Sequence, residues 1–421
     1  ASDVYKRQIY KLMIMTQAVI IGGGAAGLMA AAVCAARGKE TVVVEKMPVC
    51  AKKVSITGKG RCNVTNACFE LSDLISNVPR NPRFLYSAFS SFMPYDTMSF
   101  FEELGVPLKI ERGNRVFPQS DNAKDISSAL VRNAKKCGVK FIHTAAKSFK
   151  TENGRIKAVV LSDGSEIECE SVALCTGGKS YPATGSTGDG YALAKSVGHT
   201  VTKISPALVS LKSEDSFVPE LQGLSLRNIS IKLNKNNKTI YSDFGEMLFT
   251  HYGLSGPVIL SASSHIDEPE NGDYSVVIDL KPALDYDTLD KRIQRDFDEF
   301  KNKDVINSLS KLLPRKLIPV IIELWGIAQH KKVNEITREE RRALVHLLKN
   351  LEVGVSGFYT LDSAIITRGG INVNEIDPKT MRSKIVDNLF FAGEIIDVDA
   401  YTGGFNLQIA FSTGRLCGDN M

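Results

Sequence analysis

The sequence predicts an α/β protein in which a parallel-sheet domain is built from two separated segments and is interrupted by an inserted block. Three observations support this prediction. A buried strand, a glycine-rich turn and a helix follow one another over residues 17–37. A second strand, turn and helix occupy residues 388–417. Between them, from about residue 204, alternating strand-like segments give way to consecutive helices.

The first of these units has the spacing of a dinucleotide-binding motif. The run Gly22-Gly23-Gly24-Ala25-Ala26-Gly27 follows a buried strand and opens an alanine-rich helix. Gly22 allows the tight turn, Gly24 allows a pyrophosphate to approach the backbone, and Gly27 allows helix and strand to pack closely. Ala25 and Ala26 begin the helix, whose N-terminal amides and partial positive charge favour a phosphate. The motif therefore predicts a bound nucleotide.

A carboxylate follows the next predicted strand. The apolar run 41–44 ends at Glu45, which the motif places at the tip of the second strand. There it can accept hydrogen bonds from both hydroxyls of an adenosine ribose, and it would repel a 2′-phosphate. The site therefore favours FAD or NAD over NADP. A doubly wound sheet without a cofactor is the alternative, and the motif in this context disfavours it.

Two further polar segments are predicted to contact the same cofactor. The loop after Glu45 is too polar for a core, and its cations, glycines and amides suit a path along a pyrophosphate toward a flavin edge. The turn after the buried strand 171–175 brings backbone close to a ligand. The predicted cofactor residues here are Lys46, Lys53, Thr57, Gly58, Gly60, Arg61, Cys62, Asn63, Thr176, Gly177 and Gly178. A solvated basic loop and a plain strand-to-helix connection are the alternatives.

The C-terminal unit repeats the arrangement of strand, acid, glycine turn and helix. Its carboxylates can bind ribityl hydroxyls, and a helix N-terminus aimed at the pyrimidine end of an isoalloxazine stabilises negative charge on the reduced ring. The predicted cofactor residues here are Gly393, Glu394, Asp397, Gly403, Gly404, Phe405 and Asn406. A purely structural βα unit would not need the paired glycines. Together the motifs predict noncovalent FAD.

Composition narrows the class of protein. The 421 residues suggest about two or three domains, and 52 basic against 47 acidic residues form no concentrated basic stripe. Nucleic acid is therefore not expected as a partner. The eight cysteines include no C-x-x-C pair and no zinc spacing, so we expect reduced thiols, no metal site and a cytoplasmic protein. No apolar run approaches the roughly 20 residues of a membrane span, so no membrane partner is expected.

The predicted domain boundaries follow these motifs. Residues 1–14 are expected to be a non-native or disordered tail. Residues 15–203 and 353–421 form the Rossmann-like FAD-binding domain, and residues 204–352 form the inserted domain, with a β-rich part (204–284) and a helical part (285–350). Segments 139–143, 156–161 and 166–169 are predicted to form an antiparallel meander. The substrate is expected between the two domains, where pockets are common.

With these motifs in place, the chain resembles the BaiN/YhiN-type bacterial flavoproteins, described as NAD(P)/FAD-dependent oxidoreductases and as aminoacetone oxidase-like enzymes. The resemblance runs from about Met15 onward and includes the run 250–257, Thr-His-Tyr-Gly-Leu-Ser-Gly-Pro. It implies an FAD domain interrupted by a β-barrel that carries a helical subdomain. One branch of the family is similar to reductases of conjugated double bonds in 3-oxo bile acid intermediates. Val49-Cys50-Ala51 departs from the glycine usual before the basic pair.

Because the sequence has a single dinucleotide motif, we expect NAD(P)H to bind near the flavin only transiently. The missing C-x-x-C pair argues against a disulfide reductase. The leading hypothesis is NAD(P)H-driven reduction of an activated double bond in a small molecule by reduced FAD. Tyr401 and His251 are the candidate proton donors, although either can be purely structural. An amine or aminoketone oxidase that uses oxygen and a non-catalytic flavin-binding redox sensor remain as alternatives.

Overall fold

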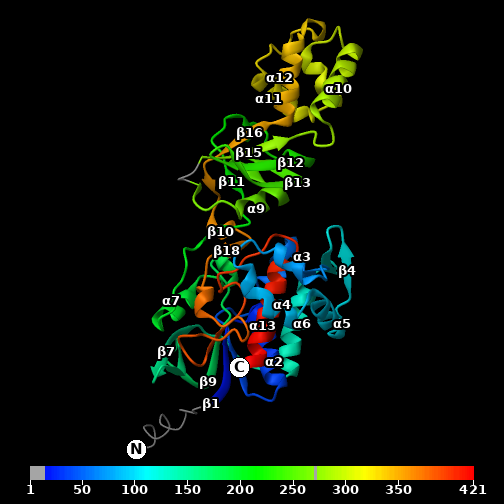
Figure 1. The fold of residues 1–421 in the computed structure, drawn as a ribbon. Coiled ribbons are helices and arrows are strands. Elements are labelled where there is room, and N and C mark those ends of the chain that lie inside the picture. Colours follow the sequence, from blue (N-terminus) through cyan, green and yellow to red (C-terminus); the bar gives the residue numbers. More distant parts are fainter. Residues whose placement is uncertain (1–14, 270–272) are drawn as a thin grey trace, which may run out of the picture. The chain divides into compact units, whose positions relative to one another are not determined.

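The computed structural model describes residues 15–269 and 273–421, and the expected tail 1–14 lies outside this part of the chain. The chain divides into two compact units (Figure 1). The first unit holds the described residues up to Ala207 together with Leu361–Met421, and the second holds Leu208–Thr360. The second unit ends at Thr360 rather than at residue 352, because β16 (Leu351–Val355) and β17 (Gly357–Phe358) pair within its sheet.

A largely parallel sheet forms the centre of the first unit. Strand β1 (Met15–Ile21) lies between β2 (Thr41–Val44) and β9 (Glu166–Leu174), and β6 (Lys140–Ile142) pairs with the other edge of β2. Strand β19 (Leu389–Phe391) pairs in parallel with the C-terminal end of β9. All four residues of β2 are buried, as expected for a strand covered on both faces. The C-terminal segment therefore completes a sheet that the N-terminal segment begins.

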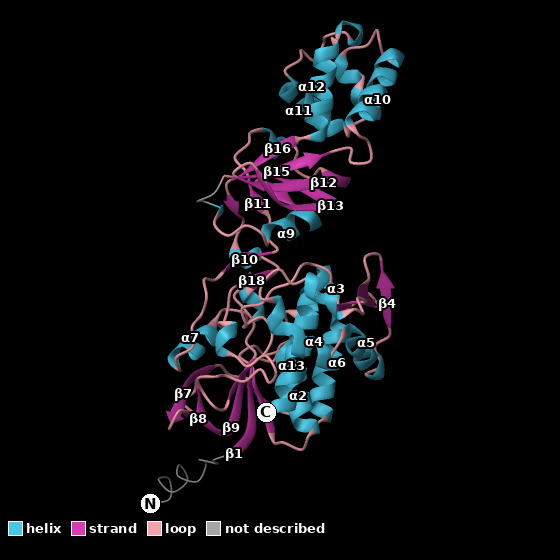
Figure 2. Ribbon diagram, viewed as in Figure 1, coloured by secondary structure: helices cyan, strands magenta, loops and turns pink. Residues whose placement is uncertain are grey.

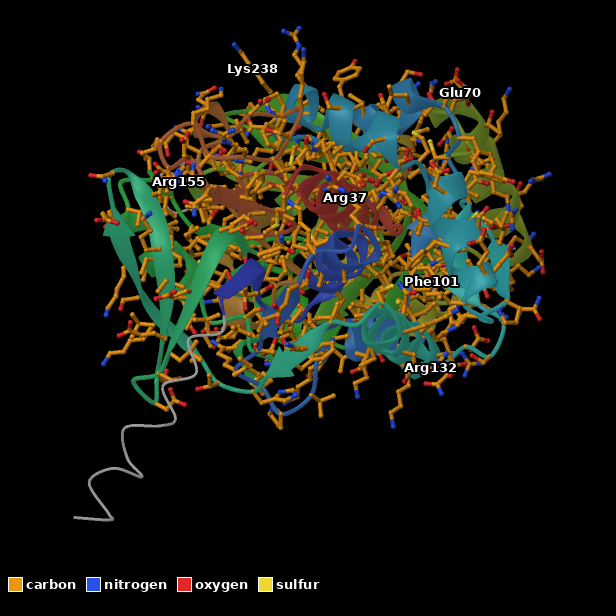
Figure 3. The ribbon with its side chains drawn as sticks, turned by 90° about the horizontal axis from the view of Figure 1, so that it is seen from below. Arg37, Glu70, Phe101, Arg132, Arg155 and Lys238 are labelled. Carbon is orange, nitrogen blue, oxygen red and sulfur yellow. The ribbon has the colours of Figure 1, made fainter. Side chains whose placement is uncertain are left out.

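Helices α2 (Ala25–Ala36) and α13 (Phe405–Asn420) pack against each other over this sheet (Figure 1). Their approach is close because α13 carries glycines at the contact. A Cβ added at Gly414 would lie 2.5 Å from the carbonyl oxygen of Ala26, and one added at Gly418 would lie 2.7 Å from that of Ala30. At the end of α2, Arg37 Nη1 donates a hydrogen bond of 2.8 Å to the Gly418 carbonyl, where the two helices meet (Figure 3).

The meander differs from the sequence prediction. Segment 139–143 contains β6, which joins the parallel sheet, and the meander is formed by β7 (Ala146–Glu152), β8 (Arg155–Leu161) and β9. Figure 3 labels Arg155 on this hairpin. The segments 166–169 and 171–174 belong to the single strand β9. They are continuous because β9 pairs with β1 along one edge. On its other edge, the first residues of β9 pair with β8 and the last residues pair with β19.

Shorter elements cover the rest of the first unit. Residues 86–91 and 94–103 form two separate helices, because Pro94 lacks an N–H and begins a new helix instead of continuing the first. A small sheet with the order β3-β5-β4 was not expected. These elements are η1 (Val54–Gly60), β3 (Thr65–Asn66), α3 (Leu71–Ser76), α4 (Tyr86–Ser91), α5 (Pro94–Glu103), β4 (Leu108–Glu111), β5 (Arg115–Pro118), α6 (Ala123–Lys136) and α7 (Asp189–Ser196).

The second unit is built on an antiparallel sheet with the order β16-β15-β12-β13-β14-β11-β17. Strands β16 and β17 stand at opposite ends of this order, yet only Ser356 separates them in the chain. The sheet therefore curves back on itself as a barrel does, and the Ser356 amide donates to the Lys212 carbonyl at 3.0 Å. The other strands are β11 (Leu211–Lys212), β12 (Ser225–Lys235), β13 (Lys238–Thr250), β14 (Gly253–Ser255) and β15 (Tyr274–Asp279).

Three helices, α10 (Tyr286–Glu299), α11 (Ile318–Trp325) and α12 (Arg338–Lys349), pack together in the second unit (Figure 2). A capping box between Thr337 and Glu340 starts α12, and Trp325 Nε1 donates to the Glu340 carbonyl at 2.7 Å. The helices share one apolar core with the sheet. The described residues include no helix with the length and apolar character to cross a membrane.

Candidate functional site

The glycine turn has the geometry that the sequence predicts. Gly22 has a φ of +105°, and a Cβ there would lie 2.5 Å from the carbonyl oxygen of Cys175. A Cβ on Gly27 would lie 1.9 Å from the carbonyl oxygen of Gly22. Gly24 caps α2, and a Cβ there would meet no atom within 4 Å. Two glycines are thus needed for packing, whereas Gly24 leaves open space at the helix N-terminus.

Glu45 is oriented by the backbone around it. Its two carboxylate oxygens accept hydrogen bonds from the amides of Gly23 at 2.7 Å and Met47 at 2.8 Å. Lys46, its neighbour, pairs with Thr187 and with Asp189, the first residue of α7. The Glu45 carboxylate is therefore held beside the glycine turn, in the place expected for a ribose-binding acid.

Lys53 and Glu394 come together from opposite ends of the chain. Lys53 Nζ donates to Glu394 Oε2 and to Ser180 Oγ, each at 2.8 Å. Gly178 lies against the same carboxylate, since a Cβ there would be 2.9 Å from Glu394 Oε1. Gly177, in the same turn, has a φ of +70°. The loop after β2, the turn after β9 and the turn after β19 therefore converge.

The remaining residues of the polar loop have mixed environments. Arg61 forms ion pairs of 2.5 Å with both Glu111 and Asp121, so a contact with a cofactor would require it to exchange partners. Cys62 is fully buried, and burial raises the pKa of its thiol to about 12. Asn63 Oδ1 is buried and has no hydrogen-bond partner within residues 15–269 and 273–421. Thr57 Oγ1 donates to the Val54 carbonyl, while Gly58 and Gly60 have positive φ angles.

Residues from the first hundred positions of the chain contact the C-terminal motif. Asp397 is buried and accepts a hydrogen bond of 2.6 Å from Arg80 Nε. Gly404 caps α13, and a Cβ there would lie 2.3 Å from the Thr65 carbonyl oxygen. Asn406 holds the preceding loop through hydrogen bonds to the Ala400 backbone. Phe405 is buried in the core, and a Cβ on Gly393 would lie 2.8 Å from the Ala26 Cβ.

Sequence reasoning missed Asp399 in this loop. This residue is 2% exposed, and its Oδ2 has no hydrogen-bond partner in the described chain. Burial raises the pKa of this carboxyl to about 6, although the charges of Arg368 and Arg80 oppose the rise. Its place two residues after Asp397 was the available sequence signal. A buried carboxyl oxygen without a partner is the kind of group that a ligand satisfies.

The two candidate proton donors lie in different units. Tyr401 is half-buried in the first unit, where its amide donates to the Asn77 carbonyl and its carbonyl accepts from Asn406 Nδ2. His251 is exposed in the second unit, on the turn between β13 and β14. Its ring stands edge-on to Tyr252 with centroids 4.9 Å apart. Both catalytic assignments stay predictions.

The first unit fits an FAD site on three observations. Open space lies at Gly24, where a pyrophosphate would approach the N-terminus of α2. Asn63 Oδ1, Thr176 Oγ1 and Asp399 Oδ2 are buried and lack partners within the described residues. Lys53 and Glu394 supply a cation and a carboxylate at the convergence of three loops. These are the groups that a dinucleotide with hydroxyls and phosphates requires.

Known proteins resemble the chain along most of its length. The model of the HI0933-like protein Rossmann domain matches residues 16–420. A 3-dehydro-bile acid delta(4,6)-reductase of Clostridium scindens is 31% identical over 96% of this chain and 98% of its own. A ribosomal RNA dihydrouridine synthase of Escherichia coli is 28% identical over 96% of this chain and 97% of its own.

A solved structure shows the same fold at low sequence identity. The 3-ketosteroid-delta4-(5alpha)-dehydrogenase of Rhodococcus jostii, in complex with 4-androstene-3,17-dione, superposes with a TM-score of 0.52. It covers 98% of each chain at 13% identity, so it bears on the fold alone. The expected fold class, a Rossmann-like FAD-binding α/β fold with additional sheets and helices, is confirmed.

The space at Gly24 gives a test of cofactor placement. Gly24→Ala should leave the stability of the apoprotein nearly unchanged, because the φ of −84° suits alanine and no atom is close. It should weaken FAD affinity by roughly tenfold or more, since the methyl group occupies the approach of the pyrophosphate. Gly27→Ala is the matched control, and its clash should cost about 1–3 kcal/mol of folding stability. Thermal unfolding and FAD titration separate the two effects, and unchanged FAD affinity in Gly24→Ala would contradict this placement.

The buried Asp399 carboxyl predicts a pH-dependent stability. Because its pKa is higher in the folded protein, the folded state is penalised as pH rises from about 4 to about 6, and the full penalty persists above. Asp399→Asn should therefore stabilise the apoprotein by up to about 3 kcal/mol near pH 7.5, and by roughly half as much near pH 5. Denaturant unfolding at both pH values measures this. The same gain at both pH values would show that charge is not the cause.

Proposed function

We propose, because the chain belongs to the HI0933-like Rossmann-domain family, that this FAD-dependent oxidoreductase reduces a carbon–carbon double bond conjugated to a carbonyl group, with NAD(P)H as electron donor. The observation that carries the proposal is the nearly full-length likeness to a 3-dehydro-bile acid delta(4,6)-reductase. That name denotes a reduction of double bonds in a substrate with a 3-oxo group. The single dinucleotide motif supports transient binding of NAD(P)H.

Different residues of the first unit would bind different parts of the cofactor. Gly24 and the first amides of α2 would receive the pyrophosphate, and Glu45 would receive the adenosine ribose. Lys53, Glu394 and Asp397 would bind the phosphate and ribityl groups. Bound FAD supplies the hydride chemistry. The N-terminus of the 16-residue α13 would stabilise the negative charge of the reduced form.

Reduction of such a bond also needs a proton. A hydride adds to one carbon, and a proton must reach the neighbouring carbon or the carbonyl oxygen. Tyr401 and His251 are the proposed donors, because phenol and imidazole groups both transfer protons in enzymes. The Tyr401 backbone is fixed by hydrogen bonds to Asn77 and Asn406, which restricts where the phenol can reach.

A second substrate class is favoured by the E. coli relative, which is named as a ribosomal RNA dihydrouridine synthase. A Haemophilus influenzae protein with the same name is 30% identical over 95% of this chain. The ring double bond of uridine is also conjugated to a carbonyl, so it belongs to the same class of bond. The sequence-based exclusion of nucleic acid is therefore withdrawn, and uridine in RNA is the second candidate substrate beside a steroid-like 3-oxo compound.

Anaerobic flavin spectroscopy tests the proposed reaction. NAD(P)H should bleach the flavin, and a conjugated 3-oxo steroid or a uridine-containing ribosomal RNA fragment should restore its colour. Tyr401→Phe should slow the restoring step by roughly a hundredfold if its phenol supplies the proton, with the bleaching step unchanged. His251→Gln is the parallel variant for the other candidate.

Other outcomes would point to other functions. If both acceptors left the reduced flavin bleached, while an aminoketone bleached the oxidised form and produced peroxide in air, the protein would be an oxidase. If no compound changed the flavin at a catalytic rate, a redox sensor would replace the reductase. Colour restored only by RNA would identify uridine as the substrate.

A further inference from the structure

Two short strands join the first unit to the second. Strand β10 (Ser205–Ala207) ends immediately before the second unit begins at Leu208. Strand β18 (Ile366–Arg368) follows soon after that unit ends at Thr360. The strands pair in antiparallel register, with Pro206 opposite Thr367. Both chain connections to the second unit therefore run through this ribbon.

Thr367, at the centre of the ribbon, contacts two of the loops that converge at the predicted FAD site. Its amide donates a hydrogen bond of 2.8 Å to Glu394 Oε1. Its hydroxyl oxygen accepts hydrogen bonds from the amides of Lys179 at 2.7 Å and Ser180 at 3.0 Å. Thr367 as a whole residue is 1% exposed. One buried threonine thus holds both the acid of the C-terminal motif and the turn after β9.

The fit around this hydroxyl is tight. A Cβ on Gly178 would lie 2.3 Å from Thr367 Oγ1, so the turn can reach the threonine only with glycine at this position. Ser180 Oγ then lies 3.3 Å from Glu394 Oε1, and Lys53 donates to both Ser180 and Glu394. Removing the hydroxyl would leave the amide of Lys179 and the buried amide of Ser180 without their acceptor, which loosens the turn that contains Gly177 and Gly178.

We propose that Thr367 is a positioning residue of the FAD site, which holds Glu394 and the 176–180 turn in binding geometry and links them to the ribbon that carries the second unit. A threonine that served only the ribbon would need neither contact. The proposal rests on FAD binding by the first unit and not on the identity of the substrate. FAD binding should therefore order the ribbon.

Substitution of the full-length protein tests this role. Thr367→Val keeps the shape of the side chain but removes the acceptor, and it should weaken FAD affinity by roughly tenfold to a hundredfold. Thr367→Ser keeps the hydroxyl and should restore affinity to within about threefold of wild type. Thr202→Val is the matched control, because Thr202 Oγ1 accepts from the Gly370 amide beside the ribbon and has no hydrogen bond to Glu394. Its FAD affinity should be unchanged.

A second measurement needs no variant. Hydrogen exchange of the wild-type apoprotein and FAD complex should show slower exchange at the Lys179, Ser180 and Thr367 amides when FAD is bound. Unchanged exchange at these amides would overturn the link to the ribbon. Wild-type affinity in Thr367→Val, or an equal loss in Thr202→Val, would overturn the positioning role. An enone that fails to oxidise the reduced flavin would count against the proposed reaction and leave this inference standing.

Discussion

The close packing of α13 on α2 is the constraint on which the first unit depends. The glycines at 414 and 418 bring α13 within contact distance of the α2 backbone, and Gly393, after the end of β19, lies against the Ala26 side chain. A side chain at any of these positions would push the C-terminal segment away from the glycine turn. Because β19 and α13 return across this contact, residues almost 400 positions apart form one site. Small residues at the interface therefore matter as much as the predicted ligands.

The charges of the site are already paired with one another. Lys53 bonds Glu394, Arg80 bonds Asp397, and Arg61 bonds two carboxylates. A half-buried charge without a partner is costly, so the loops satisfy one another. A bound dinucleotide would exchange some of these charged partners, and it would also satisfy the buried oxygens of Asn63, Thr176 and Asp399 that have no partner within the described residues. Asp399 differs from the others, since its Oδ2 remains without a partner within the described residues.

The sequence predicted the local motifs well and the long-range contacts poorly. The roles of Gly22 and Gly27 follow from spacing, because a strand, a tight turn and a helix admit few geometries. The partners of Arg61 lie 50 and 60 residues away, one at the end of β4 and one just after β5, and these short strands have no clear period. The break at Pro94 was readable from the residue itself, whereas the continuity of β9 depends on neighbours on both edges. Asp399 was missed because its burial comes from tertiary packing.

The two kinds of relative are named for substrates of very different size, a bile acid and ribosomal RNA. Reduction of a conjugated double bond in a bile acid and in uridine requires the same transfer of hydride and proton, so one kind of FAD site can support both reactions. The difference between a compact steroid and an RNA strand must then be recognised by residues outside the FAD site. Net charge says little here, since an excess of +5 over 421 residues neither requires nor excludes RNA. The proposed link between the FAD site and the β10–β18 ribbon would allow residues outside the site to differ while the redox chemistry stays fixed.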